Sequence, residues 1–165
     1  MNFNNLDEIK KAGFVGFKKI NELFVDSSSI PKIKGVYLVL NPNYKKAAYL
    51  EIGTGWHFKG KNPNVSITQL QSNWVENSLV VYIGKAGSET GKATLNSRLK
   101  QYLGFGQGKN IGHWGGRYIW QLKYSDDLIL CWKPLLDEDP RSIENALIKK
   151  FVSEFSKRPF ANLTD

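Results

Sequence analysis

The stretch from Val80 to Tyr102 constrains the fold most, because it joins an apolar segment to an amphipathic one through a polar loop. Residues 79–83 are aliphatic, β-branched or aromatic and end at Gly84, which predicts a strand. A loop rich in Gly, Ser and Thr follows, and a helix is expected to begin near Thr94. The buried stripe of this helix is formed by leucines that recur every four residues, Leu95, Leu99 and Leu103.

Side chains suited to binding anions lie on this strand, loop and helix. Tyr82 is near the end of the strand, and Lys85 follows in the loop. Arg98 and Tyr102 are four residues apart, so they are expected to lie one above the other beside the leucine stripe. A phenol, a lysine and an Arg/Tyr pair therefore converge, and the sequence predicts an anion-binding site where they meet.

Five short motifs follow one another along the chain. They are GVY at 35–37, VYIGKA at 81–86, SRLKQY at 97–102, IEN at 143–145 and PFAN at 159–162. In this order they resemble the GIY-YIG endonuclease family, and most of all the nuclease domain of the bacterial excision-repair incision subunit and related restriction enzymes. The resemblance covers residues 35–162. It implies an α/β (α+β) fold in which a small, mainly antiparallel sheet is flanked by helices.

The resemblance also implies an activity, the metal-dependent hydrolysis of phosphodiester bonds in DNA. Arg98 would stabilise charge on the phosphate, and Tyr37 would orient or deprotonate the attacking water. Glu144 would hold one Mg²⁺ or Mn²⁺ ion. Asn162 would close the site from the tail, although it lies farther from Glu144 than in compact members of the family. The implied catalytic side chains are Tyr37, Tyr82, Lys85, Arg98, Tyr102 and Asn162.

Glu144 stands out on helix geometry alone. A helix is expected from Asp139, as N-cap, and Pro140 to about Phe155. At about 100° per residue, Glu144 falls in the apolar half of this helix, where a carboxylate is costly unless it is paired. Two interpretations stay open: a metal ligand, or a first turn that projects into water, where negative charge is mildly favourable. The sequence context IEN favours the ligand.

A long segment separates the two tyrosine motifs, whereas the family usually joins them by a shorter turn. We expect an ordered insertion at 41–79, with a possible short strand at 47–52 and a helix that begins with a capping box at Ser66 and runs through Trp74. Aromatic and basic residues at 56–61 could contact nucleic acid. The favoured alternative is that Trp56 and Phe58 only attach the insertion to the core.

The remaining segments are expected to complete a single domain, 1–165. Residues 1–30 are predicted to form a helical cover, with two short helices within 5–24 that break at Gly13 and Gly16. The glycine-rich segment 104–117 could bring backbone amides close to a phosphate. His113 is expected to be a loop histidine with its hydrogen bonds satisfied, or to line the site. Residues 118–122 and 128–132 are predicted to pair as a hairpin.

Composition favours a polyanionic partner. The 165 residues include 23 Lys and Arg against 15 Asp and Glu, a net charge of +8, and nucleic acid is the commonest polyanionic partner. The resemblance implies that this partner is DNA. The candidate nucleic-acid contacts are Lys59, Lys61, Lys92, His113 and Arg117. No apolar run is long enough to span a membrane and no signal peptide is evident, so we expect a cytoplasmic protein. The single Cys131 is expected in the core, and a structural zinc site is not expected.

Two other classes of function compete with the nuclease. A binding module could keep the same fold without cutting DNA, although the set of Tyr37, Arg98 and Glu144 is intact. Residues 86–92 also read A-x-x-x-x-G-K between a strand and a helix, which is close to a phosphate-binding P-loop. However, Ala86 replaces the first glycine, and Ala93 stands where the P-loop needs a Ser or Thr for magnesium. The nucleotide-binding interpretation is therefore less favoured.

Overall fold

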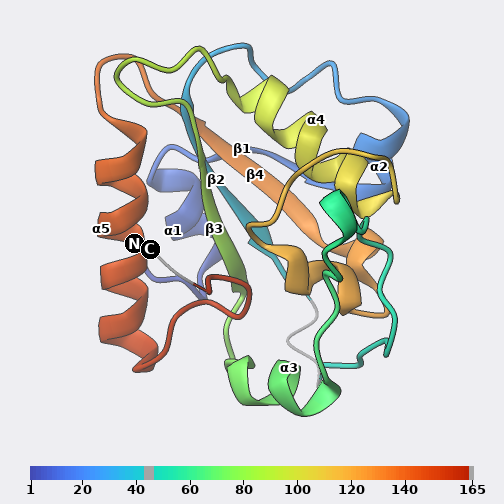
Figure 1. The fold of residues 1–165 in the computed structure, drawn as a ribbon. Coiled ribbons are helices and arrows are strands. Elements are labelled where there is room, and N and C mark those ends of the chain that lie inside the picture. The colour runs from blue at the N-terminus through green and yellow to red at the C-terminus, as the bar shows by residue number, and fades with distance from the viewer. Residues whose placement is uncertain (43–46, 164–165) are drawn as a thin grey trace.

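The computed structural model describes residues 1–42 and 47–163, and within them the chain forms an α+β fold (Figure 1). A four-stranded antiparallel sheet in these residues is flanked by helices. The strands are β1 (Val15–Lys19), β2 (Gly35–Leu40), β3 (Val80–Ala86) and β4 (Ile129–Pro134). The α-helices are α1 (Leu6–Lys11), α2 (Ile20–Val25), α3 (Ile67–Asn73), α4 (Leu95–Gly106) and α5 (Pro140–Phe155). Short 3-10 helices are η1 (Phe58–Gly60), η2 (Arg117–Gln121) and η3 (Ser125–Asp127).

The strand order is β1-β4-β2-β3, so the two motif strands are neighbours and β3 forms one edge. In the pairing of β2 with β3, Tyr37 lies opposite Gly84. On its other side β2 pairs with β4, where Tyr37 lies opposite Trp132. Every residue of β2 is buried, as expected for a central strand covered on both faces.

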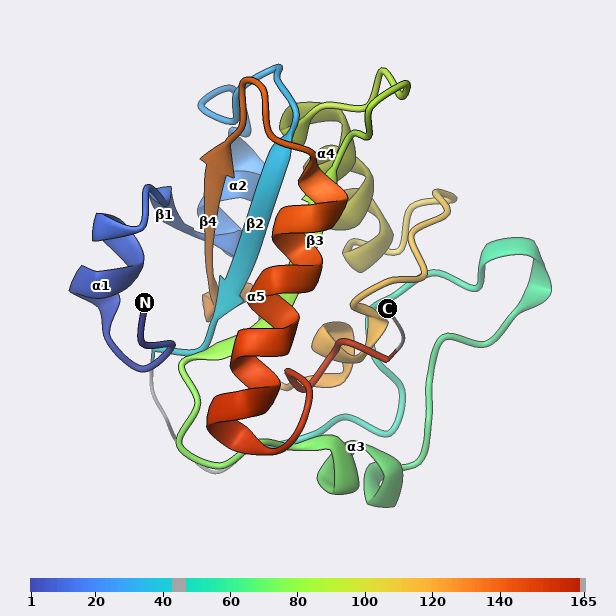
Figure 2. The ribbon, with the colours of Figure 1, turned by 90° about the vertical axis from the view of Figure 1, so that its left-hand side faces the viewer.

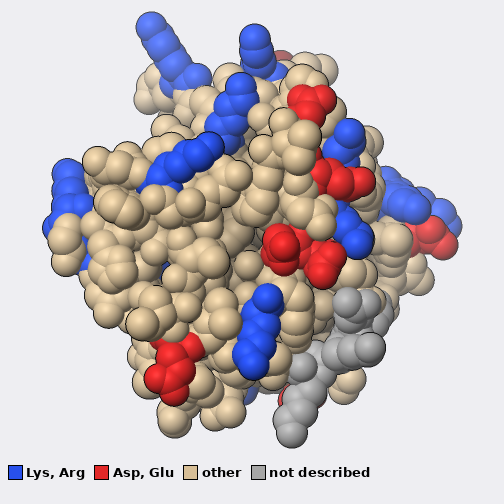
Figure 3. Space-filling model, turned by 90° about the vertical axis from the view of Figure 1, so that its right-hand side faces the viewer, with Lys and Arg blue, Asp and Glu red and all other residues tan. Residues whose placement is uncertain are grey.

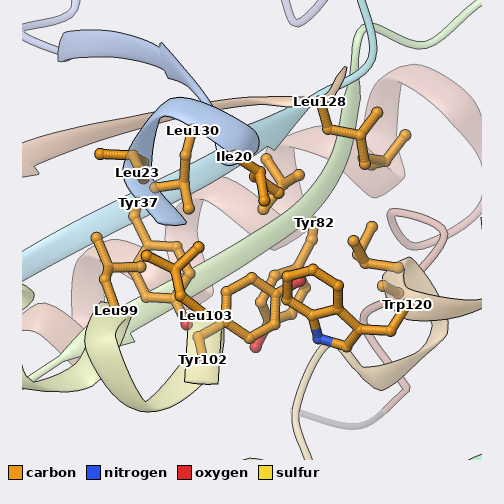
Figure 4. Packing of buried hydrophobic residues seen from close by; sticks show 14 of the residues in the cluster. Ile20, Leu23, Tyr37, Tyr82, Leu99, Tyr102, Leu103, Trp120, Leu128 and Leu130 are labelled. Atoms are coloured by element: carbon orange, nitrogen blue, oxygen red, sulfur yellow. The ribbon is translucent and has the colours of Figure 1, made fainter. Parts of the chain in front are cut away.

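The two faces of the sheet carry separate cores. The first, which we call the α4-side core, contains Tyr37, Tyr82, Leu99, Tyr102 and Trp120 among others (Figure 4). The second, the α5-side core, joins Val36 and Leu38 of β2 to Ile148 and Phe151 of α5, together with Ile9 of α1. Adjacent β2 residues alternate between the cores because successive side chains of a strand point to opposite faces. Figure 2 shows α5 lying across its face of the sheet.

The outer edge of β3 is covered by the C-terminal tail. The backbone N–H of Ala161 donates to the carbonyl of Val81 at 2.9 Å. The Asn162 side chain accepts from the Ile83 N–H at 2.9 Å and donates to the Ile83 carbonyl at 2.8 Å. The tail thus supplies hydrogen-bond partners that a neighbouring strand would otherwise provide.

Several predicted elements are confirmed. The helix after Thr94 and the helix from Pro140 to Phe155 form, with Thr94 and Asp139 as N-caps. The strand before Gly84 also forms, but it runs on to Ala86, so Lys85, which was expected in the loop, lies within β3. Cys131 is buried, as expected. Within residues 1–42 and 47–163, no helix has the length and apolar character needed to cross a membrane.

The prediction of a wholly helical cover at 1–30 is wrong. Residues 15–19 form the edge strand β1, which pairs with β4 between the two short helices. Most of β1 is at least partly exposed, and its register shifts between Val15 and Lys18, so the sequence lacks the alternation of a half-buried strand. Phe17 has a positive φ of 47°, which adds to the irregularity.

The predicted hairpin of 118–122 with 128–132 is also wrong. The second segment forms β4, but β4 has β1 and β2 on its two sides, which leaves no edge for the first segment. Residues Tyr118–Gln121 instead belong to the buried 3-10 helix η2. A short buried apolar run carries no periodicity that distinguishes a strand from a helical turn, which explains the error.

The segment 47–79 is largely irregular. The possible strand at 47–52 is reduced to one isolated bridge, between Tyr49 and Leu122, and residues 43–46 of the expected insertion lie outside the described residues. Helix α3 begins after Ser66, whose side chain accepts from the Gln69 N–H at 3.2 Å. The Gln69 side chain does not complete the capping box and donates to the Tyr118 hydroxyl at 2.7 Å.

Candidate functional site

A cleft of about 530 Å³ lies at the edge formed by β3, between the loop that follows this strand, α4 and the first turns of α5. Five residues singled out from the sequence meet in it: Tyr37, Tyr82, Lys85, Arg98 and Glu144. They come from β2, β3, α4 and α5, so the fold joins positions more than one hundred residues apart. The rest of the lining is Gly87, Ser88, Gly91, Ala93, Gln101, Arg141 and Asn145.

The two tyrosines are fixed by glycines that leave room for their rings. A Cβ on Gly84 would collide with the Tyr37 ring on the neighbouring strand, so only glycine fits opposite this tyrosine. A Cβ on Gly116 would lie 2.6 Å from Cε1 of Tyr82, and Gly116 has a φ of +72°, which favours glycine again. The Tyr37 and Tyr82 rings pack edge to face, with centroids 5.9 Å apart.

Both phenols border the cleft in their neutral form. Burial raises the pKa of Tyr37 well above its ordinary value of 10, and its hydrogen bond to Tyr82 raises it further while Arg98 opposes the shift. Burial likewise raises the pKa of Tyr82 to about 12. In the free protein at neutral pH neither is therefore a phenolate, and the Tyr37 hydroxyl donates its hydrogen bond to the Tyr82 oxygen.

Three cations surround the cleft. Lys85 comes from β3, Arg98 from α4 and Arg141 from the first turn of α5. The Arg98 side chain donates to the Gln101 amide oxygen at 3.4 Å within the same helix. Arg141 was not singled out from the sequence. Its position three residues before Glu144 places it on the same side of the helix, and this spacing could have predicted that it lines the site.

Among the residues that the structure describes, Glu144 is the one carboxylate that lines the cleft. It is half-buried, and its side chain forms no hydrogen bond and no ion pair within 4.0 Å in the described part of the chain. Burial raises the pKa of this carboxyl above its ordinary value of 4.5, while Lys85, Arg98 and Arg141 act in the opposite direction. Its surroundings therefore leave the carboxylate oxygens without a protein partner.

Two residues predicted to be catalytic do not line the cleft, although Asn162 lines a neighbouring cavity of about 160 Å³ together with Tyr82 and Glu144. Tyr102 is fully buried in the α4-side core, where its ring is 4.9 Å from that of Trp120 and its hydroxyl donates to the Gly116 carbonyl at 3.4 Å. Asn162 is also buried, and both ends of its amide bond the backbone of Ile83. The contacts of both side chains support the fold around the cleft.

The predicted nucleic-acid contacts are dispersed. Lys59, Lys61 and Lys92 are exposed. His113 is 2% exposed, and burial lowers its pKa to about 3, so it is a neutral core residue and is not available to DNA. Neither ring nitrogen of His113 has a hydrogen-bond partner in the described residues, contrary to the expectation of a satisfied histidine.

Arg117 lies next to the cleft without lining it. Its guanidinium is 4.5 Å from the Trp114 ring, and it borders a separate cavity of about 160 Å³. Tyr82 and Glu144 line both this cavity and the cleft. The cleft and the smaller cavity therefore lie on either side of Tyr82 and Glu144.

The insertion packs against the glycine-rich segment. The Trp56 indole donates to the Asn110 amide oxygen at 3.1 Å, and a Cβ on Gly112 would lie 2.6 Å from the Phe58 ring. Trp56 and Phe58 thus hold the insertion to this segment, outside both cores. On the face that carries the insertion, Lys and Arg side chains are dispersed with acidic side chains among them (Figure 3).

The cleft offers cations, neutral hydroxyl donors and one carboxylate, which together suit a phosphate group accompanied by a metal ion. Among the described residues no group of three His, Cys, Asp or Glu side chains could form a metal cage. A scan against protein-family models, a search of curated proteins and a search of solved structures found no match for this chain.

Proposed function

We propose that the protein is a metal-dependent DNA endonuclease with a GIY-YIG-like fold. The observation that carries this proposal is Glu144, a half-buried carboxylate that has no hydrogen-bond or ion-pair partner within residues 1–42 and 47–163. The cleft around it also presents three cations and two tyrosines from this part of the chain. Such a cleft suits the hydrolysis of a phosphodiester, which needs a bound water and positive charge around the phosphate oxygens.

The residues present fit one magnesium or manganese ion. Mg²⁺ is commonly held by one or two carboxylates, with waters and substrate phosphates as its other ligands, so Glu144 would suffice as the acidic ligand. When bound, the ion would polarise a water and neutralise charge on the phosphate. One carboxylate in the cleft favours a single ion over a pair.

The remaining side chains have separate tasks in the proposed reaction. Arg98 would hold two phosphate oxygens with its planar fork, while Lys85 and Arg141 would add positive charge around the phosphate. Tyr82 would donate a hydrogen bond to the water or the phosphate, and Tyr37, which donates to Tyr82, would accept one from the water. Because burial raises the pKa of Tyr37, we assign it the orientation of water, and its use as a base would require the pKa to fall on substrate binding.

The test is cleavage of supercoiled, linear and branched DNA by wild type and Glu144→Gln, with magnesium and with a chelator. The change keeps the size of the side chain but removes its charge, so cleavage should be lost while DNA binding persists. Glu154→Gln is the matched control, because Glu154 is an exposed glutamate on the same helix. This variant should cleave DNA at the wild-type rate. Cleavage by Glu144→Gln at the wild-type rate would refute the metal-ligand assignment.

The same assay separates the competing functions. DNA binding without magnesium-dependent cleavage would identify a binding module. ATP hydrolysis would identify a nucleotide hydrolase, but the loop contacts oppose that function. The Ser97 N–H donates to Thr94 Oγ1 at 3.1 Å and the Gly91 N–H donates to Ser88 Oγ at 2.9 Å, so these amides are not free to bind a phosphate.

A further inference from the structure

A second groove, of about 610 Å³, begins where the cleft ends. It runs beside the C-terminal half of α5, and Asn145 lines both the groove and the cleft. Figure 2 shows the tail turning back beside this end of the helix. The groove is lined by Asn145, Ile148, Lys149, Val152, Ser156, Lys157 and Arg158.

The geometry of α5 places the residues of both hollows on one side. Arg141, Asn145 and Lys149 are spaced by four residues, so they lie within about 80° of one another around the helix axis. Arg141 and Lys149 are separated by about 12 Å along the axis at about 1.5 Å per residue. Glu154 points away from this stripe, about 140° from Lys149 at about 100° per residue.

The charge of the groove matches a polyanion. Three of its lining residues are cationic, and no described residue that lines it is acidic. Lys149 is exposed and forms no ion pair within 4.0 Å in the described residues. Lys157 has its ammonium 3.3 Å from the Ser72 carbonyl, which orders this side of the groove.

We propose that one strand of DNA leaves the cleft along α5 and occupies this groove, with Lys149 contacting a backbone phosphate. This inference rests on the proposed function and adds the path of the substrate beyond the cut. The distance of about 12 Å corresponds to three or four base-pair steps measured along the axis of a duplex, which rises about 3.4 Å per nucleotide of each strand. The ligand class is a nucleic-acid backbone, bound through its charge without reading of sequence.

Affinity measured as a function of salt tests the path. With duplex DNA and a chelator to prevent cleavage, Lys149→Ala should reduce the slope of log affinity against log salt by about 1, the effect of losing one phosphate contact. Lys149→Glu should reduce affinity further by repulsion. Lys150→Ala is the matched control, since Lys150 is exposed on the same helix but about 140° from Asn145 around it. The control should keep the wild-type slope.

Cleavage measurements separate this inference from the proposed function. At saturating DNA, Lys150→Ala should cleave at the wild-type rate, whereas Lys149→Ala should need a higher DNA concentration for half-maximal cleavage, because the groove binds the strand away from the reacting phosphate. If wild type binds and cleaves DNA but Lys149→Ala and Lys149→Glu have the slope of Lys150→Ala, the path is wrong and the nuclease stands. If wild type neither binds nor cleaves DNA, the proposed function fails and the path fails with it.

Discussion

At the scale of single residues, the cleft depends on an imbalance of charge. Three cations and one carboxylate of the described chain line it, and the carboxylate of Glu144 lies beyond 4.0 Å from all three cations. The cations therefore form no ion pair with Glu144, and a phosphate could bind them without breaking such a pair. This arrangement makes Arg98 and Glu144 the two positions at which substitutions are most informative.

Arg98→Ala should lower the cleavage rate by about 10² or more, the scale seen when a donor that stabilises transition-state charge is removed. Arg98→Lys should restore only part of the rate, because an ammonium lacks the planar fork of the guanidinium. Single-turnover cleavage rates with magnesium check both expectations. Full activity of the lysine variant would reduce Arg98 to a general positive charge.

Glu144 should also make stability depend on pH. The pKa of the Glu144 carboxyl is raised above 4.5 in the folded state, so the folded protein binds the carboxyl proton more tightly than the unfolded chain does. The protein therefore loses stability as pH rises from 4.5 through the folded-state pKa. Glu144→Gln lacks the effect. In thermal melts without metal, the Tm of the variant minus the Tm of wild type should therefore increase between pH 4 and pH 7. A constant difference between the two proteins would mean that Glu144 is solvated.

At the scale of elements, the sequence predicted those parts of the fold that carry local signals. The cap at Asp139 and Pro140 marks α5, and the apolar run before Gly84 marks β3. Strand β1 was not predicted because residues 15–19 are extended through their pairing with β4, which lies more than one hundred residues later in the chain. A partner so distant leaves no local pattern.

The candidate site could be predicted to a similar extent. Tyr37, Arg98 and Glu144 were found through their motifs and do line one cleft. Tyr102 shares a helix with Arg98, but only the packing around Trp120 decides that its ring points into the core. The side-chain bonds of Asn162 to β3 depend on the tertiary path of the tail, which spacing alone does not reveal.

Asn162→Ala should destabilise the fold by about 1–3 kcal/mol, because it leaves the N–H and carbonyl of Ile83 without their partner. Asn145→Ala is a suitable control, since the half-buried Asn145 side chain forms no hydrogen bond in the described residues; the expected change is within about 0.5 kcal/mol. Urea unfolding of both variants measures the difference. Equal stability of the two would show that the amide bonds of Asn162 contribute little.

At the scale of the whole molecule, the distribution of charge would determine where DNA first binds. The net charge is +8, yet the face bearing the insertion has basic and acidic side chains interspersed (Figure 3). Lys85, Arg98 and Arg141 instead gather in the cleft. Productive binding should therefore depend on the side of the molecule that carries α5 and the edge strand β3.

Binding of DNA by wild type should weaken steeply as salt rises, because phosphate contacts release condensed counterions. Titrations of labelled duplex at several salt concentrations, with a chelator present, give the slope. A dissociation constant that stays flat between low and moderate salt would exclude a binding mode based on phosphate contacts.

The tail along β3 has a consequence for the behaviour of the protein in solution. An exposed edge strand presents unpaired backbone groups that can pair with another chain and start aggregation. Ala161 and Asn162 occupy such groups on Val81 and Ile83. At the opposite edge, β1 carries a register shift and two lysines, Lys18 and Lys19, which discourage pairing in another way. The short tail segment therefore blocks pairing at this edge, and we expect its removal to expose the edge to pairing with another chain.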